Sequence, residues 1–146
     1  MAGVSIKNLT RQHQKVVAGS VFSAIAKRVL PAWDISLVFV GSKKARALNE
    51  QLRSKTYIPN VLSYAVGDKN GEIFICLQEA RKQAPLHAMT ERMFILYLFI
   101  HGLLHLKGWA HGATMERCEQ QILAHVTTNS NRHRHRHLPD KNGGRR

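Results

Sequence analysis

The sequence predicts an α+β protein: a single compact domain with a mixed sheet of about four strands, a central buried helix and a disordered basic C-terminal tail. Three observations support this fold class. Short β-branched runs alternate with longer segments of helical periodicity. The run "MFILYLFIHGLLHL" is apolar nearly all round, as expected of a helix buried on every side. Residues 129–146 are polar, low in complexity and without an apolar face.

The first half of the chain predicts two strands and two helices in alternation. "VSIKNL" (4–9) alternates weakly and predicts the first strand. Residues 11–30 place apolar side chains at helical spacing, and Pro31 ends that helix. The β-branched run 33–40 predicts the second strand. Ser42 is then the expected N-cap of a basic helix, "KKARALNEQLRS".

The middle of the chain predicts a β-hairpin. Residues 60–66 follow Pro59 and read as a strand, and residues 72–77 read as another. Between them, "GDKNG" has the composition of a turn. The two strands are therefore expected to pair with each other.

Two helices and a tail complete the prediction. Pro85 suits the first turn of a helix that continues to Leu106. Its apolar stretch is shorter than the roughly 18 to 20 residues that a membrane span needs. A last helix is expected over about 113–127. We expect a folded domain over 1–128, followed by the disordered tail, 129–146.

The charge of the chain favours polyanionic partners. Its 146 residues carry 22 Lys and Arg against nine Asp and Glu, a net charge of +13. Residues 129–146 hold six basic residues and one acid, so the domain itself remains basic. Such a balance indicates nucleic acid first and an anionic membrane second. The "RHRHRH" stretch is predicted to be an electrostatic arm, the alternative being a loose metal-collecting segment.

Cysteine usage and the start of the chain bear on the compartment. Cys76 and Cys118 do not make a disulfide framework, and Cys76 lies in an apolar run that indicates a core thiol. The first residues have no long apolar stretch, so neither export nor a membrane span is expected. We expect a cytoplasmic protein, with an organelle matrix as the alternative.

The stretch "HGLLHLKGWAHG" concentrates three histidines. On the central helix, His101 and His105 are four residues apart and share a face. Gly108 permits a left-handed turn, after which His111 can fold back onto that face. Three nitrogen donors with an open position are typical of catalytic zinc or a similar divalent ion. The alternative is that these are core histidines whose nitrogens are satisfied by neighbours.

The same spacing occurs in metzincin peptidases, H-E-x-x-H-x-x-G-x-x-H. Those enzymes use the glutamate beside the first histidine as the base for zinc-bound water. Here Gly102 occupies that position and has no proton acceptor. A peptidase is therefore a weak alternative for this chain.

Three stretches resemble one known family. "HGLLHLKGWAHG" is similar to the signature H-G-x-L-H-L-x-G-Y-D-H of the YbeY family, metal-dependent endoribonucleases that mature ribosomal RNA. "LNEQLRSKTYIPNVLSYAV" (48–66) resembles the family's L-N-x-x-Y-R-x-K-x-x-P-T-D-V-L-S-F-P stretch, and "GEIFIC" (71–76) resembles its G-D-I-x-I-C strand. The likeness covers roughly residues 34 to 124.

The resemblance implies a set of functional residues. It implies that a divalent ion, presumed to be Zn²⁺, is bound by His101, His105 and His111. It also implies that Arg53 contacts RNA phosphate and stabilises charge as the bond breaks, which suits the bidentate pairing of guanidinium with phosphate. Lys55 and Ser63 are predicted RNA contacts. Glu116 matches a family acid, or is simply a charge that favours a helix N-terminus.

The departures from the family pattern concern the site. Ala110 replaces the aspartate before the third histidine, and an outer carboxylate of that kind can orient a ligand. Tyr64 and Ala65 replace Phe-Pro. The departure at Ala110 therefore concerns the metal site rather than the fold.

The resemblance implies an endoribonuclease specific for single strands, acting in maturation of small-subunit ribosomal RNA and in ribosome quality control. Its partners would be ribosomal RNA and small-subunit proteins, with no small-molecule cofactor. No strong general base is visible, which leaves water or the substrate's 2′-hydroxyl as the nucleophile. The alternative is a non-catalytic ribosome-assembly factor that binds RNA and holds a structural metal.

Overall fold

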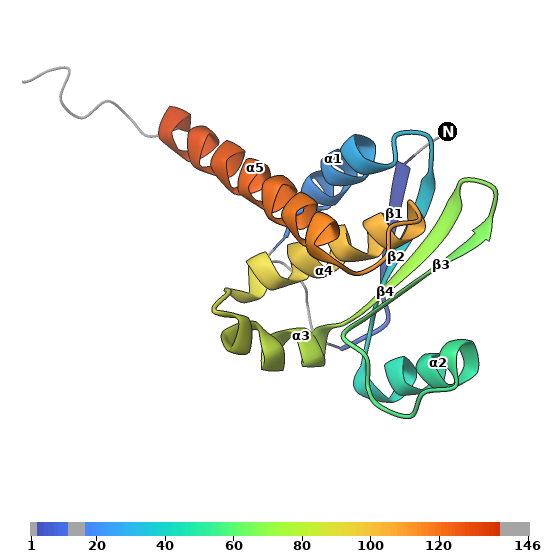
Figure 1. Cartoon of the computed structure of the whole chain (residues 1–146). Coiled ribbons are helices and arrows are strands. Elements are labelled where there is room, and N and C mark those ends of the chain that lie inside the picture. Colours follow the sequence, from blue (N-terminus) through green and yellow to red (C-terminus); the bar gives the residue numbers. More distant parts are fainter. Residues whose placement is uncertain (1–2, 12–16, 138–146) are drawn as a thin grey trace, which may run out of the picture.

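The computed structural model describes residues 3–11 and 17–137, with backbone alone for residues 128–137. Figure 1 shows the elements along the chain. The strands are β1 (Gly3–Asn8), β2 (Asp34–Val40), β3 (Val61–Gly67) and β4 (Asn70–Cys76). The helices are α1 (Gly19–Val29), α2 (Ser42–Arg53), α3 (Leu77–Gln83), the 3₁₀ helix η1 (Ala84–His87), α4 (Glu91–Leu106) and α5 (Ala113–His137).

The four strands form one mixed sheet in the order β1-β2-β4-β3. β1 and β4 run parallel to β2, with Leu37 opposite Ile73, whereas β3 is antiparallel to β4. The predicted mixed sheet and hairpin are therefore confirmed. The hairpin turn places Lys69 in the left-handed region, at φ 57°.

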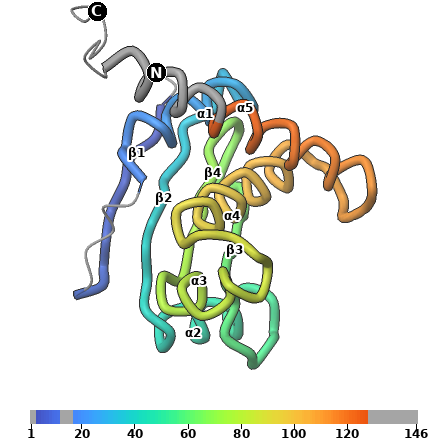
Figure 2. Tube along the Cα trace, turned by 90° about the vertical axis from the view of Figure 1, so that its left-hand side faces the viewer, coloured from blue at the N-terminus to red at the C-terminus, as the bar shows by residue number. Residues whose placement is uncertain are grey.

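The two faces of the sheet are covered differently. One face carries Leu37, Ile73 and Ile75 and packs against α4, with α1 and α5 adding to the same core. Near one end of the other face, Val40 packs with Ala45 of α2 in a small separate cluster. Figures 1 and 2 show α4 running across the sheet and α2 set apart at one end.

The central helix is buried on nearly every side, as predicted. Phe94, Phe99 and Leu103 of α4 are fully buried, and Phe99 packs edge-on against Phe22 of α1, with ring centroids 5.0 Å apart. Burial of large aromatic and aliphatic side chains is the main stabilising contribution to such a core. No helix in the described part of the chain has the length and apolar character needed to cross a membrane.

The helix predicted from Pro85 to Leu106 is two elements. Pro85 lies in η1, where the chain turns at Ala88 (φ 55°), and α4 begins only after Thr90. The Thr90 side chain accepts a hydrogen bond from the Met93 amide, 3.1 Å away, and this cap sets the start of α4. The short helix α3 before it was not predicted.

The predicted N-cap of α2 is wrong. Gly41 holds that position, and Ser42 is the first helical residue. The Ser42 hydroxyl instead donates a hydrogen bond to Gln78 Oε1 at 2.6 Å, which ties α2 to α3. The Ser42 side chain therefore bonds to another helix instead of capping its own helix.

Two predicted helix ends are displaced. The first helix begins at Gly19 rather than near residue 11, and residues 12–16 lie outside the described residues. The last helix, α5, ends at His137 rather than at about residue 127. Residues 138–146 of the predicted tail lie outside the described residues, and the domain boundary at 128 stays a prediction.

Candidate metal centre

The two helical histidines lie on the least buried stripe of α4. Tyr97, His101 and His105 follow one another at intervals of four and are half-buried, whereas the residues between them on α4 are buried. The ring centroids of His101 and His105 are 4.5 Å apart, and their Nε2 atoms are 3.0 Å apart. The predicted sharing of a face by these two rings is confirmed.

A C-terminal cap on α4 brings His111 back. The Gly108 amide donates to the His105 carbonyl at 2.9 Å, and the Trp109 amide donates to the Leu104 carbonyl at 3.0 Å. These paired bonds form a Schellman motif, with Gly108 at φ 101° in the left-handed region that glycine tolerates best. The His111 ring then lies 4.4 Å from that of His105 and 4.9 Å from that of His101.

The electrostatic environment favours neutral imidazoles. Burial, followed by repulsion from His111, lowers the pKa of His101 from 6.5 to about 4. Burial also lowers the pKa of His105, against a smaller opposing effect from its hydrogen bond with the Trp109 backbone. Near neutral pH these rings therefore keep a free lone pair, which is the form that binds a metal ion.

The geometry fits a divalent metal ion. Within the described residues, His101, His105 and His111 are the group whose ligand atoms all lie within 4.8 Å of one another. Two nitrogens on one tetrahedral zinc ion at about 2.0–2.1 Å would be about 3.3 Å apart, close to the separation of the two helical Nε2 atoms. His111 is exposed, so the cluster opens to solvent on that side.

A carboxylate that the sequence analysis missed lies behind the cluster. Glu119 of α5 is 2% exposed, and its Oε2 contacts Nδ1 of His101. Burial raises the pKa of Glu119, and the charge of Glu116 raises it further. The signal was present in the sequence, because an acid falls between Met115 and Ile122 on the apolar face of α5.

The other predicted site residues fall in two places. Arg53 ends α2, where it is exposed and donates to the Tyr57 hydroxyl at 3.3 Å, and Lys55 follows it, also exposed. Ser63 lies on β3 opposite Ile73, so it shares the sheet face that packs against α4. Glu116 is exposed in the first turn of α5.

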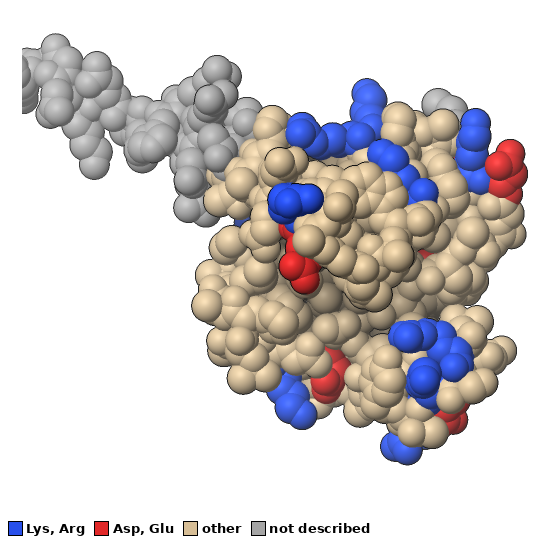
Figure 3. Space-filling model, in the orientation of Figure 1, with Lys and Arg blue, Asp and Glu red and all other residues tan. Residues whose placement is uncertain are grey.

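Basic side chains gather around Arg53. Figure 3 shows Lys and Arg over α2, separated by a hollow from the rest of the molecule. The exposed basic residues of α2 and the loop after it, here called the α2 basic lobe, are Lys43, Lys44, Arg46, Arg53 and Lys55. An anionic ligand in that hollow would meet this lobe.

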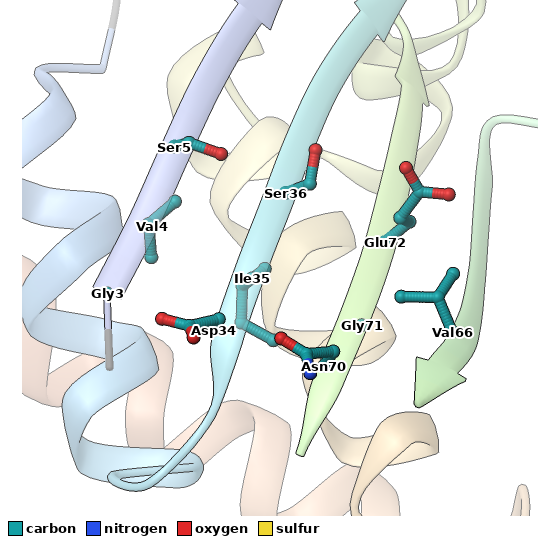
Figure 4. A pocket seen from close by; sticks show the side chains of 10 residues that line it. All are labelled: Gly3, Val4, Ser5, Asp34, Ile35, Ser36, Val66, Asn70, Gly71 and Glu72. Atoms are coloured by element: carbon teal, nitrogen blue, oxygen red, sulfur yellow. The ribbon is translucent and has the colours of Figure 1, made fainter. Parts of the chain in front are cut away.

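A second hollow, of about 420 Å³, lies on the sheet away from the histidines. Figure 4 shows its lining, which includes Ser5, Asp34 and Glu72 from three different strands. Glu72 is already engaged by the Tyr64 hydroxyl, and burial, followed by this hydrogen bond, raises the pKa of Tyr64 to about 12. This hollow contains no group of metal ligands, and the histidine cluster remains the candidate site.

Comparisons with known proteins find a matching family, curated relatives and a solved structure. The family described as "Endoribonuclease YbeY" matches residues 4–129. An endoribonuclease YbeY of Bdellovibrio bacteriovorus is 34% identical over 80 residues, 53% of each chain. That of Mesoplasma florum is 34% identical over 102 residues, 61% of this chain and 59% of the relative.

These curated relatives are matched over only part of their length, since the chain spans between about half and three-fifths of each. A solution structure from Thermotoga maritima aligns with a TM-score of 0.65 at 21% identity. It covers 98% of this chain and 99% of that chain, and it therefore supports the α+β fold.

Proposed function

This chain belongs to the endoribonuclease YbeY family, and we propose that it is a metal-dependent endoribonuclease that hydrolyses phosphodiester bonds in single-stranded RNA. The observation that carries this proposal is the convergence of three imidazoles from α4 and the turn after it. We propose that the substrate is ribosomal RNA of the small subunit and that small-subunit proteins are further partners. We also propose a cytoplasmic location, which the free thiols of Cys76 and Cys118 support.

His101, His105 and His111 would hold the ion, and we propose Zn²⁺. A bound zinc ion supplies a Lewis acid for a phosphoryl oxygen and lowers the pKa of water, so that a nucleophile is available at neutral pH. The chain's own contribution is to keep the rings of His101 and His105 unprotonated by burial. The Schellman turn at Gly108 holds His111 in reach of both.

The α2 basic lobe would bind the RNA backbone. Arg53 is the last residue of α2. Its guanidinium can pair with two phosphate oxygens at once and offset the negative charge that develops during cleavage. Lys55 would add attraction to phosphate. Ser63, on the sheet face that packs against α4, would hydrogen-bond the RNA nearer the histidines.

A second candidate function is an RNA-binding assembly factor with a structural metal. Ala110 favours this candidate, because the family signature has an aspartate there that could orient a ligand. A peptidase is disfavoured by Gly102, which is buried where a catalytic glutamate would have to stand.

The decisive experiment is cleavage, by the purified chain, of a structured ribosomal RNA fragment that includes a single-stranded segment. We expect cleavage by the wild type, its loss with chelator, and its loss in His105→Ala. His125→Ala, on the exposed side of α5, is the matched histidine control and should cleave normally. Tight RNA binding with equal processing by wild type and His105→Ala would overturn the nuclease and favour the assembly factor.

A further inference from the structure

Glu119 is a buried acid in an otherwise apolar surface. It lies on the face of α5 that carries Met115, Ile122 and Leu123, all of which are buried against the core. Its carboxylate is 2% exposed, and a carboxylate removed from water is costly unless it is paired. A leucine at this position would pack against α4 without that cost, so core stability does not explain the acid.

The contact between Glu119 and His101 is specific to one ring nitrogen. Glu119 Oε2 meets Nδ1 of His101, while Nε2 of the same ring faces Nε2 of His105 at 3.0 Å. A neutral imidazole carries its proton on one nitrogen only. If Nδ1 donates to the carboxylate, Nε2 keeps its lone pair and directs it toward the other two histidines.

We propose that Glu119 is the positioning residue of the metal centre, selecting the Nδ1–H tautomer of His101 and fixing the orientation of its ring. This inference rests on the proposed function, because it takes the three histidines as metal ligands. A carboxylate that accepts the second ring N–H makes an imidazole a stronger donor. Glu119 therefore supplies, from α5, a carboxylate next to a metal ligand, in a chain that has Ala110 where the family signature has an aspartate.

The test measures Zn²⁺ affinity by competition with a chelating indicator, using the full chain. Glu119→Leu removes the acceptor and should weaken Zn²⁺ binding about 10- to 100-fold, the usual range for such outer partners. Its free energy of unfolding without metal should be equal to or higher than that of the wild type. Glu119→Gln keeps the shape and an acceptor oxygen but loses the charge, and should weaken binding less. Glu79→Gln, on α3, is the charge-matched control and should bind as the wild type does.

A second readout needs no metal. In the metal-free wild type, the ¹⁵N chemical shifts of His101 should report a proton on Nδ1, and Glu119→Leu should lose that preference. If the wild type binds no Zn²⁺, the proposed function fails whatever the tautomer. If the wild type binds Zn²⁺ and both Glu119 variants bind it equally well, with the tautomer unchanged, the role of Glu119 is refuted while the metal centre stands.

Discussion

Gly102 lies directly over Ile73, and a Cβ atom added at Gly102 would stand 3.2 Å from two side-chain carbons of that isoleucine. Ile73 is fully buried in the centre of the sheet, so it has little room to move. The glycine next to the first histidine is therefore a packing requirement, because it lets α4 approach β4 closely. The same contact explains why this helix has no place for the glutamate of a metzincin peptidase.

Gly102→Ala should therefore destabilise the protein. Alanine favours a helix over glycine by about 1 kcal/mol, but overpacking a close-packed core costs about 1–3 kcal/mol. We expect a net loss of about 1 kcal/mol in the free energy of unfolding, measured by urea denaturation. Gly3→Ala is the control, since nothing lies within 4 Å of an added Cβ there. A Gly102→Ala protein more stable than the wild type would show that Ile73 yields easily.

Replacing Asn49 with alanine should lower the free energy of unfolding. It is fully buried on α2, and its Nδ2 donates to the Tyr57 carbonyl at 2.9 Å. Asn49→Ala leaves that carbonyl without its donor, which costs about 1–3 kcal/mol in the free energy of unfolding. Amide hydrogen exchange should also quicken in the loop that carries Lys55.

The matched control for Asn49 is Gln51→Ala, on the exposed face of the same helix. Its free energy of unfolding should stay within about 0.5 kcal/mol of the wild type. A similar loss in both variants would mean that helix propensity, rather than the hydrogen bond to Tyr57, governs this region.

The fold was predictable where local pattern and tertiary packing agree. Strands β2, β3 and β4 are apolar or β-branched runs, α4 is apolar nearly all round, and the hairpin turn has characteristic residues, whereas β1 alternates only weakly. One error occurred where a distant partner decided the outcome. Ser42 bonds to Gln78 of another helix rather than to its own helix end, and only the folded chain brings the two together.

The sequence predicts the part of the site that lies within one segment of the chain, but not the contacts between separate elements. His101, His105 and His111 fall within one short segment, so helical spacing and a glycine turn suffice to bring their rings together. Glu119 reaches His101 from the next helix, and its contact depends on how α5 packs against α4. The position of Arg53 relative to the histidines likewise depends on where α2 lies beside the sheet.

Arg53→Ala should slow RNA cleavage with little effect on the fold. Arg53 is exposed at the end of α2, and removing one donor that stabilises transition-state charge typically costs about 100- to 1,000-fold in rate. Arg53→Lys should recover only part of that loss, because an ammonium cannot pair bidentately with phosphate. Single-turnover cleavage of the same RNA fragment measures both.

Lys27→Ala, on the exposed side of α1, removes one positive charge and controls for net charge. It should cleave at close to the wild-type rate at moderate salt. If Lys27→Ala and Arg53→Ala slow cleavage equally, Arg53 acts through overall charge alone and has no specific role at the phosphate.

The metal-free protein should lose stability as the pH falls from about 6.5 toward 4. Burial holds the pKa of His101 at about 4 in the folded chain, against 6.5 ordinarily, so in this window the unfolded chain binds more protons. Each such proton lowers the free energy of unfolding by up to about 1.4 kcal/mol per pH unit. Urea midpoints at pH 7, 6 and 5 measure the slope, and His101→Gln should flatten it. Saturating Zn²⁺ should steepen it, because protons and the ion compete for the same nitrogens. A pH slope that is the same in the wild type and in His101→Gln would mean that His101 is not held neutral by burial.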